Sequence, residues 1–365
     1  MIVKNEAAFL EGCLSALRTH VDEIVIVDTG SSDGTPEIAR RFDCKLLHQP
    51  WQGNFSAARN YAIDNGSCDW VLYIDADERL SCKGNVPLAS LLPDADVKGL
   101  RVKFRPRTDM TCYDELRLFR RDPRIRFKGS MHESIVPSVK AVCDADDGQI
   151  MQQYAIAIDH LGYDGNQHHK HHRNVPLLLQ AIVENPNRVF LRYDLGYRLD
   201  ALARKDEAAE HLAVGMRLAA RKQASEQERV EGSMCAQVLV SMFLDTEQAD
   251  DALSAASDGL ALFKDNMALH WGKARCLVAL GRSDEAISLL EPLSQHDPET
   301  FFDRRIAYSK SVFGEDVHGL LGAARFRAGN YVGACQSYAN AMRFAPDSLE
   351  FRTKLALSKA RANSL

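Results

Sequence analysis

Residues 23–36 have the sequence EIVIVDTGSSDGTP, which joins a β-branched run to a turn rich in small residues. The run that ends at Val27 is typical of a central strand buried on both faces. The turn begins at Asp28, and Thr35 followed by Pro36 predicts the N-cap and the first position of a helix. A strand that leads through a turn into a helix is one unit of an α/β sheet.

Residues 6–20, upstream of this unit, are predicted to form a helix with one buried face. Apolar side chains recur there with the 3.6-residue period of a helix, at Leu10, Cys13, Leu14 and Leu17. The alternation of helices and strands therefore begins close to the first residue.

A second junction between a strand and an acidic turn follows downstream. Residues 55–65 have a helical pattern that stops at Gly66, and residues 70–74 form a second predicted buried strand that runs directly into the sequence DADE at 75–78. Both acidic turns follow carboxyl ends of strands, the edge at which open α/β sheets bind ligands. We expect residues 1–165 to form an α/β domain with a mostly parallel sheet.

Beyond about Asn174 the strand pattern disappears, and Ala and Leu recur with helical spacing. A pattern in which Gly is followed after five residues by Ala and after 17 residues by Pro occurs twice. Its members are Gly281, Ala286 and Pro298 in one copy, and Gly329, Ala334 and Pro346 in the other. A generic helical bundle would show the Ala and Leu periodicity but not these recurring offsets.

The spacing of these patterns is that of tetratricopeptide repeats. Ala252 and Ala286 are 34 residues apart, which is the period of that repeat. Between the two best copies the period is 48, so roughly 14 extra residues, including 301–313, lengthen a helix or form a loop there. We expect residues 166–365 to form a helical linker and tetratricopeptide-like repeats, whose concave surface suits an extended peptide or protein.

Composition excludes several classes of protein. The 365 residues are 45% hydrophobic and 26% charged, which is typical of a globular chain, and the net charge of −5 argues against a general affinity for nucleic acid or anionic membranes. Nine cysteines without a CxxC pair argue against both a disulfide framework and a structural zinc site, and they fit a reducing compartment.

No targeting segment is evident. We see neither a signal peptide at the start nor an apolar run of about 18 residues that could span a bilayer. The expected location is therefore cytoplasmic, without an integral membrane segment, although docking on a membrane through a partner is compatible with the sequence.

The second acidic turn has the composition of a cation site. Asp75 and Asp77, separated by one residue at a strand end, can hold a hard divalent cation and a ribose side by side, because Mg²⁺ and Mn²⁺ prefer oxygen ligands. Asp28 before the Gly/Ser turn and Arg59 on the preceding helix strengthen this interpretation, since Arg59 could pair with phosphate. The sequence contains neither a phosphate-binding P-loop nor a dinucleotide fingerprint.

Four motifs in order resemble the family 2 glycosyltransferases with a GT-A fold. They are MIVKNE at 1–6, VDTGSSDGT at 27–35, AARN at 57–60 and DADE at 75–78. Further motifs are similar to the branch with C-terminal tetratricopeptide repeats, which includes relatives of peptide S-glycosyltransferases: Arg117-Leu118-Phe119-Arg120, His132-Glu133 and His160-Leu161-Gly162-Tyr163. Family members usually have several apolar residues before IVKNE, whereas here Met1 begins the motif, so the first strand is expected to be short or the chain start truncated.

The resemblance implies an inverting, metal-dependent enzyme that uses a nucleotide-sugar donor, with a UDP-sugar as first choice, and a peptide or protein acceptor. Asp28 would contact the base, Asp75 the ribose, and Asp77 the Mn²⁺ or Mg²⁺ ion that bridges the diphosphate. Glu6 and Arg59 would line the nucleotide cleft.

The resemblance also suggests the remaining roles. Glu133 is the first choice as general base, with Asp114 and Glu115 as alternatives. Its competing structural role is an ion pair with Arg126 or Lys128.

The third metal ligand and the phosphate contacts come from later motifs. His160 and His132 are each candidates for the third metal ligand, or for structural histidines. Arg117 and Arg120 are the cations predicted to lie near phosphate. The histidine-rich tract at 168–172 resembles a metal-binding tract in composition, but we interpret it as a solvated segment between domains.

Two other functions compete with this hypothesis. One keeps the chemistry and assigns a lipid-linked or cell-envelope glycan as acceptor. The other is a repeat scaffold whose first domain has lost catalysis, although the intact Asp28, Asp75, Asp77 and Arg59 argue against it.

Overall fold

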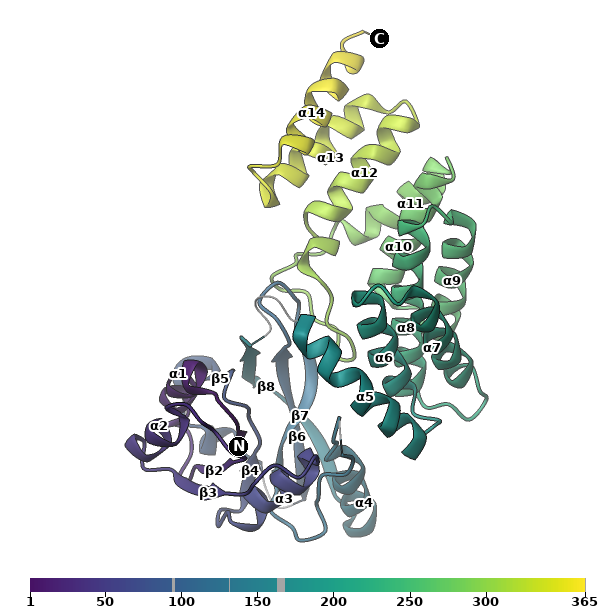
Figure 1. Cartoon of the computed structure of the whole chain (residues 1–365). Helices are drawn as coiled ribbons and strands as arrows, with labels where there is room; N and C mark the ends of the chain where they lie inside the picture. The colour runs from purple at the N-terminus through teal and green to yellow at the C-terminus, as the bar shows by residue number, and fades with distance from the viewer. Residues whose placement is uncertain (94–95, 131, 163–167, 365) are drawn as a thin grey trace. The chain divides into compact units, whose positions relative to one another are not determined.

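The computed structural model describes residues 1–93, 96–130, 132–162 and 168–364. The chain divides into two compact units (Figure 1). The first unit contains Met1–Thr108 and Cys112–Gly165, and the second contains Asp109–Thr111 and Asn166–Leu365. A tripeptide from the first part of the sequence is therefore built into the second unit.

The first unit is an α/β domain. Its elements in chain order are β1 (Ile2–Val3), α1 (Ala7–Leu17), β2 (Val25–Asp28), α2 (Thr35–Arg41), β3 (Lys45–His48), α3 (Phe55–Asp64), β4 (Trp70–Leu72), β5 (Glu78–Cys82), the 3₁₀ turns η1 (Lys83–Asn85) and η2 (Leu88–Leu91), β6 (Val97–Arg105), β7 (Tyr113–Arg120), α4 (Val136–Asp146) and β8 (Gln149–His160).

A parallel three-stranded sheet with the order β1-β2-β3 contains the first acidic turn. Val3 is paired with Asp28, so the loops that follow β1 and β2 leave the sheet at the same edge. The predicted helix before this strand is confirmed as α1, and its buried residues are the four that the periodicity indicated. The sequence pattern was sufficient here because α1 and β2 are adjacent in both sequence and space.

Helix α2 begins one position earlier than predicted. Gly34, and not Thr35, is its N-cap. The Thr35 hydroxyl donates to Asp33 and accepts from the Glu6 amide, so it ties two loops together and does not cap its own helix. Helix α3 begins as its sequence suggests, with the Asn54 side chain accepting from the Ala57 amide as an N-cap.

The remaining strands form a five-stranded sheet with the order β4-β7-β6-β8-β5. Only β6 and β8 are parallel, and the other three neighbouring pairs are antiparallel. The expectation of a mostly parallel sheet is therefore correct for β1-β2-β3 and wrong for this sheet. The short connection between β6 and β7 accounts for one of the antiparallel pairs, because it can only return the chain as a hairpin.

Strand β4 is shorter and less buried than predicted. It spans Trp70–Leu72, and all three residues are half-buried. It lies at the end of the strand order, so its second edge has no partner strand among the described elements. An edge strand covers less of its surface than the central strand that the apolar run predicts.

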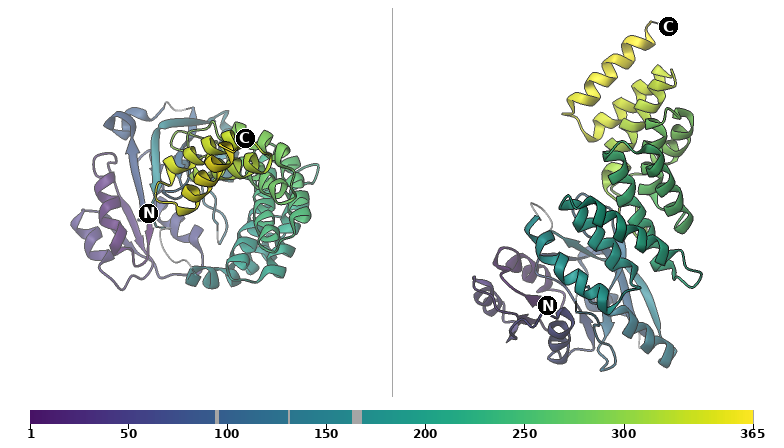
Figure 2. Two further views of the ribbon diagram at one scale, coloured as in Figure 1. Left: turned by 90° about the horizontal axis from the view of Figure 1, so that it is seen from above. Right: turned by 45° about the vertical axis from the view of Figure 1, so that its right-hand side comes forward.

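The second unit is helical. It consists of α5 (His168–Glu184), α6 (Val189–Ala201), α7 (Lys205–Ala219), α8 (Glu226–Asp245), α9 (Ala249–Leu262), α10 (Met267–Ala279), α11 (Ser283–Leu293), the 3₁₀ turn η3 (Lys310–Val312), α12 (Glu315–Arg327), α13 (Tyr331–Phe344) and α14 (Leu349–Ala362). Successive helices pack against one another from α5 onward, as the two views of Figure 2 show.

The repeated residues have repeated structural roles. Gly281 follows α10 with φ 77°, and Gly329 follows α12 with φ 80°, a left-handed conformation that ends a helix and favours glycine. Ala286 and Ala334 are fully buried at the matching positions of α11 and α13. The helix pairs are thus successive copies of one unit, as the spacing predicted.

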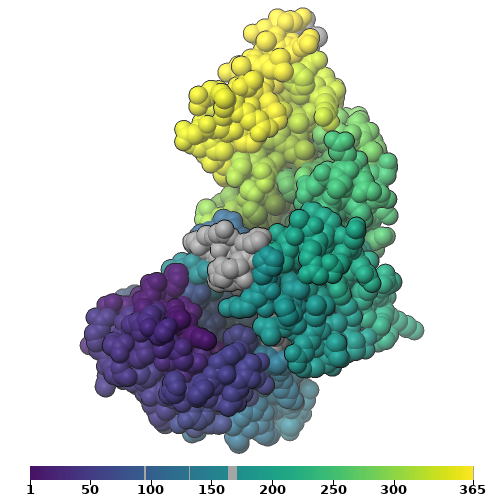
Figure 3. Space-filling view, in the orientation of Figure 1, coloured from purple at the N-terminus to yellow at the C-terminus, as the bar shows by residue number. Residues whose placement is uncertain are grey.

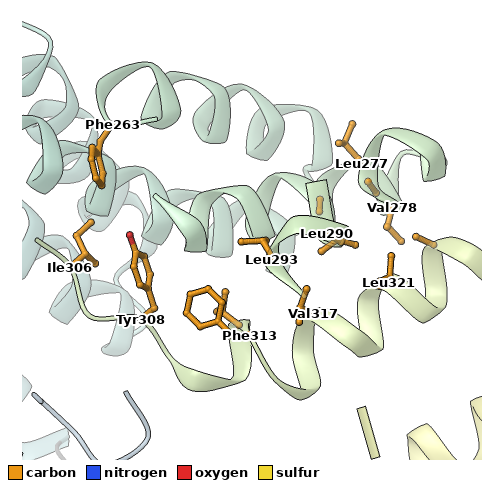
Figure 4. Packing of buried hydrophobic residues seen from close by; sticks show 14 of the residues in the cluster. Phe263, Leu277, Val278, Leu290, Leu293, Ile306, Tyr308, Phe313, Val317 and Leu321 are labelled. Atoms are coloured by element: carbon orange, nitrogen blue, oxygen red, sulfur yellow. The ribbon is translucent and has the colours of Figure 1, made fainter. Parts of the chain in front are cut away.

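The extra residues between the two best copies form a loop and do not lengthen a helix. The loop joins α11, which ends at Leu293, to α12, which begins at Glu315, and contains only the turn η3. It is anchored by apolar side chains: in Figure 4, Ile306, Tyr308 and Phe313 point toward the helices next to the loop.

Two further features of the helices bear on function. The histidine-rich tract begins helix α5 and is therefore not an irregular segment. At the other end of the unit, Ser358 is the only buried residue of α14, and Figure 3 shows this helix in yellow on the open surface. Within the described part of the chain, no helix combines the length and apolar composition needed to cross a bilayer.

We predict that Leu290→Ala destabilises the repeat unit by about 2–5 kcal/mol, because the side chain is fully buried in the cluster of Figure 4 and its loss leaves a cavity. Leu357→Ala is the matched control, since this leucine is 51% exposed. Chemical denaturation followed by far-UV circular dichroism measures both variants. Equal effects would contradict the proposed position of the core.

Candidate functional site

The loops after β1 and β2 are held together by side chains. The Asn5 side-chain oxygen accepts from the Ser32 amide at 2.7 Å, and the Asn5 amide donates to the Ser31 hydroxyl at 2.9 Å. Asn5 has φ 58°, a conformation that asparagine tolerates better than most residues. Next to it, the Glu6 carbonyl accepts from the amides of Phe9 and Leu10 in the first turn of α1. Glu6 therefore lies between β1 and α1, in the loop that Asn5 joins to the loop after β2.

Asp28 shapes the second of these loops. One oxygen of its carboxylate accepts from the amides of Gly30 and Ser31 at 3.0 and 2.8 Å. Gly30 has φ 112°, which requires glycine at this turn. The Asp28 residue is only 5% exposed, so it is a fixed part of the loop and not a flexible surface carboxylate.

Arg59 on α3 joins two acidic segments. Its guanidinium makes a two-pronged contact with Asp75, at 3.0 and 3.2 Å, and donates from Nε to Glu133 at 2.5 Å. The rings of Tyr73 and Phe127 lie 5.5 Å from the guanidinium carbon, and the side chain is 12% exposed. The structure thus brings together three predicted site residues from three separate segments.

The ion-pair partner of Glu133 differs from the partners that the sequence suggested. Its described partner is Arg59, whereas Arg126 pairs with Asp64 at 2.7 Å. The ion pair also sets the charge of the site. Burial alone would raise the pKa of Asp75, but the Arg59 guanidinium outweighs it and lowers that pKa to about 2.

The side chain of Glu78, the last residue of the turn at 75–78, closes that turn. A Glu78 carboxylate oxygen accepts from the Asp75 amide at 2.9 Å, and the same carboxylate receives two bonds from Arg117 at 2.8 and 3.0 Å. Glu78 is 1% exposed. Burial raises the pKa of Glu78, although the Arg117 charge opposes this. The turn is therefore rigid on the side that faces the protein interior.

Arg117 has a structural environment and not the predicted position near phosphate. It is 5% exposed, pairs with Glu78 and Glu115, and lies between the rings of Tyr73 and Phe104 at 4.7 and 4.4 Å. A guanidinium enclosed in this way has no face left for a diphosphate. The prediction failed because six cations in twelve positions gave no indication of which ones point inward.

Arg120 also does not occupy the predicted position near phosphate. It donates to the Pro93 carbonyl at 2.9 Å and lies 4.4 Å from the Trp70 ring. It is paired with Trp70, at the start of β4, whereas Asp75 follows the end of that strand. The two positions are therefore at opposite ends of β4.

Asp77 and His160 meet where β5 begins and its antiparallel neighbour β8 ends. The Nε2 atom of His160 lies 3.2 Å from an Asp77 carboxylate oxygen, and the Leu161 amide donates to the Asp77 carbonyl at 2.8 Å. A Cβ atom on Gly162 would lie 1.8 Å from the same Asp77 oxygen, so only glycine fits there. Tyr163, the last residue of the predicted motif, lies outside the described residues.

The hydrogen bonds of His160 determine what can lie between it and Asp77. The Nδ1 atom lies 3.1 Å from the Pro106 carbonyl, which can only accept, so Nδ1 carries a hydrogen. Nε2 of the neutral ring therefore presents a lone pair to a carboxylate, an arrangement that requires either a proton or a cation. Burial lowers the pKa of His160, but the bond to Asp77 and the nearby carboxylates outweigh it, and the net shift is upward.

These two side chains fit a divalent cation. A metal-binding histidine commonly donates its second ring nitrogen to a carbonyl, as His160 does to Pro106. The predicted third ligand, His132, does not complete the site. Among the residues that the structure describes, no three His, Cys, Asp or Glu side chains form a group that could hold a metal. A bound cation would therefore take its other ligands from substrate phosphates and water.

The two alternative bases lie in different environments. Asp114 is paired with Arg101 at 3.0 Å and accepts from the Tyr154 hydroxyl at 3.1 Å, and it is 5% exposed. The Glu115 side chain is 32% exposed and contacts the buried Arg117. Glu115 is thus the more accessible of the two, and Asp114 is fully engaged in its own network.

Helix α1 connects the two groups of loops. The Cys13 thiol donates to the Asp75 carbonyl at 3.4 Å. The Arg79 guanidinium donates to the carbonyls of Phe9 and Ala76, both at 3.0 Å. The same helix begins at the loop that carries Glu6, so one rigid element positions both acidic turns.

Sequence reasoning did not assign a role to Glu78, and it misassigned Arg117. The signal that could have found them is alternation along β7. Tyr113, Glu115 and Arg117 occupy every second position of that strand, so they share a face of the sheet. Two charged residues on a buried face require partners, and Glu78 supplies one.

Two family models match parts of the chain. Residues 1–83 match the model of glycosyl transferase family 2. The chain carries a family 2 glycosyltransferase domain. Residues 243–308 match a tetratricopeptide repeat model, so the helical unit of this glycosyltransferase-domain protein contains tetratricopeptide repeats.

Three curated relatives share part of the chain. A TPR repeat-containing protein of Synechococcus elongatus is 39% identical over 45% of this chain and 41% of its own length. The glycosyltransferase SunS of Bacillus phage SPbeta is 25% identical over 58% and 51%. The lipopolysaccharide core biosynthesis glycosyltransferase LpsC of Rhizobium meliloti is 32% identical over 44% and 63%. The chain thus spans about half the length of these relatives.

We predict that Arg59→Met destabilises the first unit by about 3–5 kcal/mol, because it leaves Asp75 and Glu133 without their buried partner. Thermal and chemical denaturation measure this loss. Arg124→Met is the matched control: Arg124 also bridges two carboxylates, Asp122 and Asp146, but its side chain is 50% exposed. That variant should change stability little, and a loss equal to that of Arg59→Met would show that burial is not the cause.

Proposed function

We propose that this protein is a glycosyltransferase that moves a sugar from a nucleotide-sugar donor, a UDP-sugar as first choice, to a polypeptide bound by its helical repeats. The observation that carries the proposal is the pairing of Asp77 with His160, two residues after an Asp75 that is locked by Arg59. Asp77 lies within residues 1–83, which match the family 2 model, and His160 lies further along the chain in the same α/β unit.

The proposed metal, Mn²⁺ or Mg²⁺, would be held by Asp77 and His160. A divalent cation at this position neutralises negative charge on the leaving diphosphate. Gly162 leaves room for Asp77, and Pro106 fixes the tautomer of His160 that can act as a ligand. Within the described contacts, no side chain other than His160 is paired with Asp77, so the rest of the ion's surface is available to phosphate.

The remaining predicted contacts concern the nucleoside. Asp75 is 35% exposed, and each of its oxygens keeps a second lone pair after bonding Arg59, which suits ribose hydroxyl groups. Asp28 and Glu6 lie on the two joined loops at the neighbouring sheet edge, where we assign the base. Arg59 then acts by holding Asp75 and not by binding phosphate.

The transfer itself requires a proton acceptor. In an inverting transfer the acceptor atom attacks the anomeric carbon while the bond from that carbon to the diphosphate oxygen breaks, and a general base takes the acceptor proton. Glu133 remains our candidate, because one of its oxygens is fixed by Arg59 and the other is not used in that bond. Glu115 is the alternative.

A second acceptor class has one observation in its favour. The relative LpsC is named for lipopolysaccharide core biosynthesis. The repeats favour a polypeptide, because stacked helix pairs present an extended surface suited to a peptide. Incubation with a labelled donor and both acceptor classes separates the two. Sugar on a core oligosaccharide and none on polypeptides would replace our acceptor assignment.

We predict that UDP-sugars with Mn²⁺ raise the melting temperature, since a ligand at 100 times its Kd stabilises the native state by about 2.7 kcal/mol. Asp77→Asn should abolish this shift and the Mn²⁺-dependent hydrolysis of the donor, while Asp69→Asn, an exposed carboxylate outside the site, should retain both. Differential scanning fluorimetry across a panel of nucleotide sugars provides the measurement. No shift with any donor would favour the scaffold hypothesis.

We predict that Glu133→Gln lowers kcat for transfer by about 10²–10⁴-fold, because the amide keeps the bond from Arg59 but cannot accept the proton. The Kd for the donor should stay within a few-fold of the parent value. Glu115→Gln, measured in the same assay, is the control. A large loss in Glu115→Gln and none in Glu133→Gln would transfer the role of base to Glu115.

A further inference from the structure

Residues 49–54 join β3 to α3 (Figure 1) and continue the pairing of β3 with β2 past the end of the sheet. The Gln49 amide donates to the Asp28 carbonyl at 3.0 Å, and the Trp51 amide donates to the Thr29 carbonyl at 3.3 Å. The start of this segment is therefore fixed beside the loop that Asp28 shapes, where we assign the base of the donor.

The other end of the segment is fixed to helix α3. The Asn54 side chain caps this helix, and the Phe55 amide donates to the Ser130 carbonyl at 3.1 Å. Arg59, which holds Asp75, follows Phe55 by four residues, a rise of about 6 Å along the helix. The segment thus lies between the loop assigned to the base and the helix whose arginine holds the carboxylate assigned to the ribose.

Trp51 presents an aromatic surface in the middle of this segment. The residue is 38% exposed, and its ring meets the Phe55 ring at an angle of 62° with the centroids 4.6 Å apart. Two residues later Gly53 has φ 73°, which favours glycine, so the backbone turn is specific. The contact with Phe55 orients the indole without burying it, and an oriented, partly exposed indole suits stacking on a flat ring.

A narrow cleft next to Trp51 contains a polar atom that lacks a partner. Gln49, Trp51, Thr29 and Ala58 are among the residues that line the cleft. The Gln49 side-chain oxygen is buried there and accepts no hydrogen bond from the part of the chain that the structure describes. A buried acceptor without a donor costs free energy, which a ligand that brings an N–H group would recover.

We propose that Trp51 is the platform on which the nucleobase of the donor stacks, and that Gln49 accepts a hydrogen bond from an N–H group on the edge of that base. Uracil, the base of our first-choice donor, has such a group at N3. Both residues touch the base and not the reacting atoms, so they determine affinity and base selectivity. This inference rests on the proposed function, because it requires a nucleotide-sugar donor.

Calorimetric titration of the full chain with UDP and Mn²⁺ tests the platform. Trp51→Ala should raise the Kd for UDP roughly 5- to 100-fold, because it removes the stacking of base on aromatic ring. Trp51→Phe keeps a flat ring and should stay within a few-fold of the parent. Tyr61→Ala is the matched control: Tyr61 is 37% exposed on α3, outside the cleft, and its loss should leave the Kd for UDP unchanged.

Pyrophosphate with Mn²⁺ serves as the ligand that lacks a base. Its Kd should be the same in the parent, Trp51→Ala, Trp51→Phe and Tyr61→Ala. An unchanged affinity for UDP in Trp51→Ala would overturn the platform. An equal loss of affinity for UDP and pyrophosphate would also overturn it, because the substitution would then disturb the site as a whole.

A methylated base tests the role of Gln49. The parent should bind UDP roughly tenfold more tightly than 3-methyl-UDP, which lacks the N3 hydrogen. Gln49→Leu should bind the two about equally, and its melting temperature without ligand should not fall, since the lost oxygen has no partner among the described residues. A preference for UDP retained in Gln49→Leu would assign the N3 hydrogen to another acceptor and overturn the role of Gln49.

The outcomes separate this inference from the proposed function. A parent protein that binds none of UDP, CDP, ADP and GDP in the presence of Mn²⁺ would remove the proposed function and the platform together. A parent that binds UDP, with the same affinity in Trp51→Ala, would remove the platform and leave the proposed function in place.

Discussion

The buried guanidinium of Arg59 is the interaction on which the site depends. It joins α3, the turn that follows β4 and the loop before α4 through Asp75 and Glu133. An arginine in this position can leave water only because both carboxylates and two aromatic rings replace its hydration. The same contact lowers the pKa of Asp75 and holds it ionised, so one group provides both the architecture and the charge of the site.

Arg117 is a second buried arginine that, like Arg59, pairs with two carboxylates. Arg117 pairs with Glu78 and Glu115, and Glu78 closes the turn that carries Asp75. The two guanidinium groups are therefore shared among four carboxylates, and Asp77 adds a fifth. This excess of negative charge supports the proposal of a divalent cation beside Asp77, because a cation offsets charge that the arginines leave unbalanced.

The helical unit shows how a repeat can acquire a specific contact. Stacked helix pairs need only short connections, and in the two best copies the first helix of the pair is followed by a left-handed glycine, Gly281 or Gly329. The connection between α11 and α12 is longer than the others. Its additional residues bury Tyr308 and pair with Asp109–Thr111. The break in the repeat period therefore coincides with a loop that makes its own specific contacts.

The sequence alone determined the elements that depend on neighbouring residues: the buried face of α1, the acidic turns after β2 and β4, and the repeated glycines and alanines. It also placed Arg59, Asp75 and Glu133 in one site, through motifs that resemble a known family. Tertiary structure decided which partner each charge takes. Arg117 and Arg120 follow the same pattern in sequence, but one faces the buried carboxylates and the other faces Trp70. Local periodicity specifies which residues can be buried, whereas the pairing of buried charges depends on contacts between distant segments, which no local pattern contains.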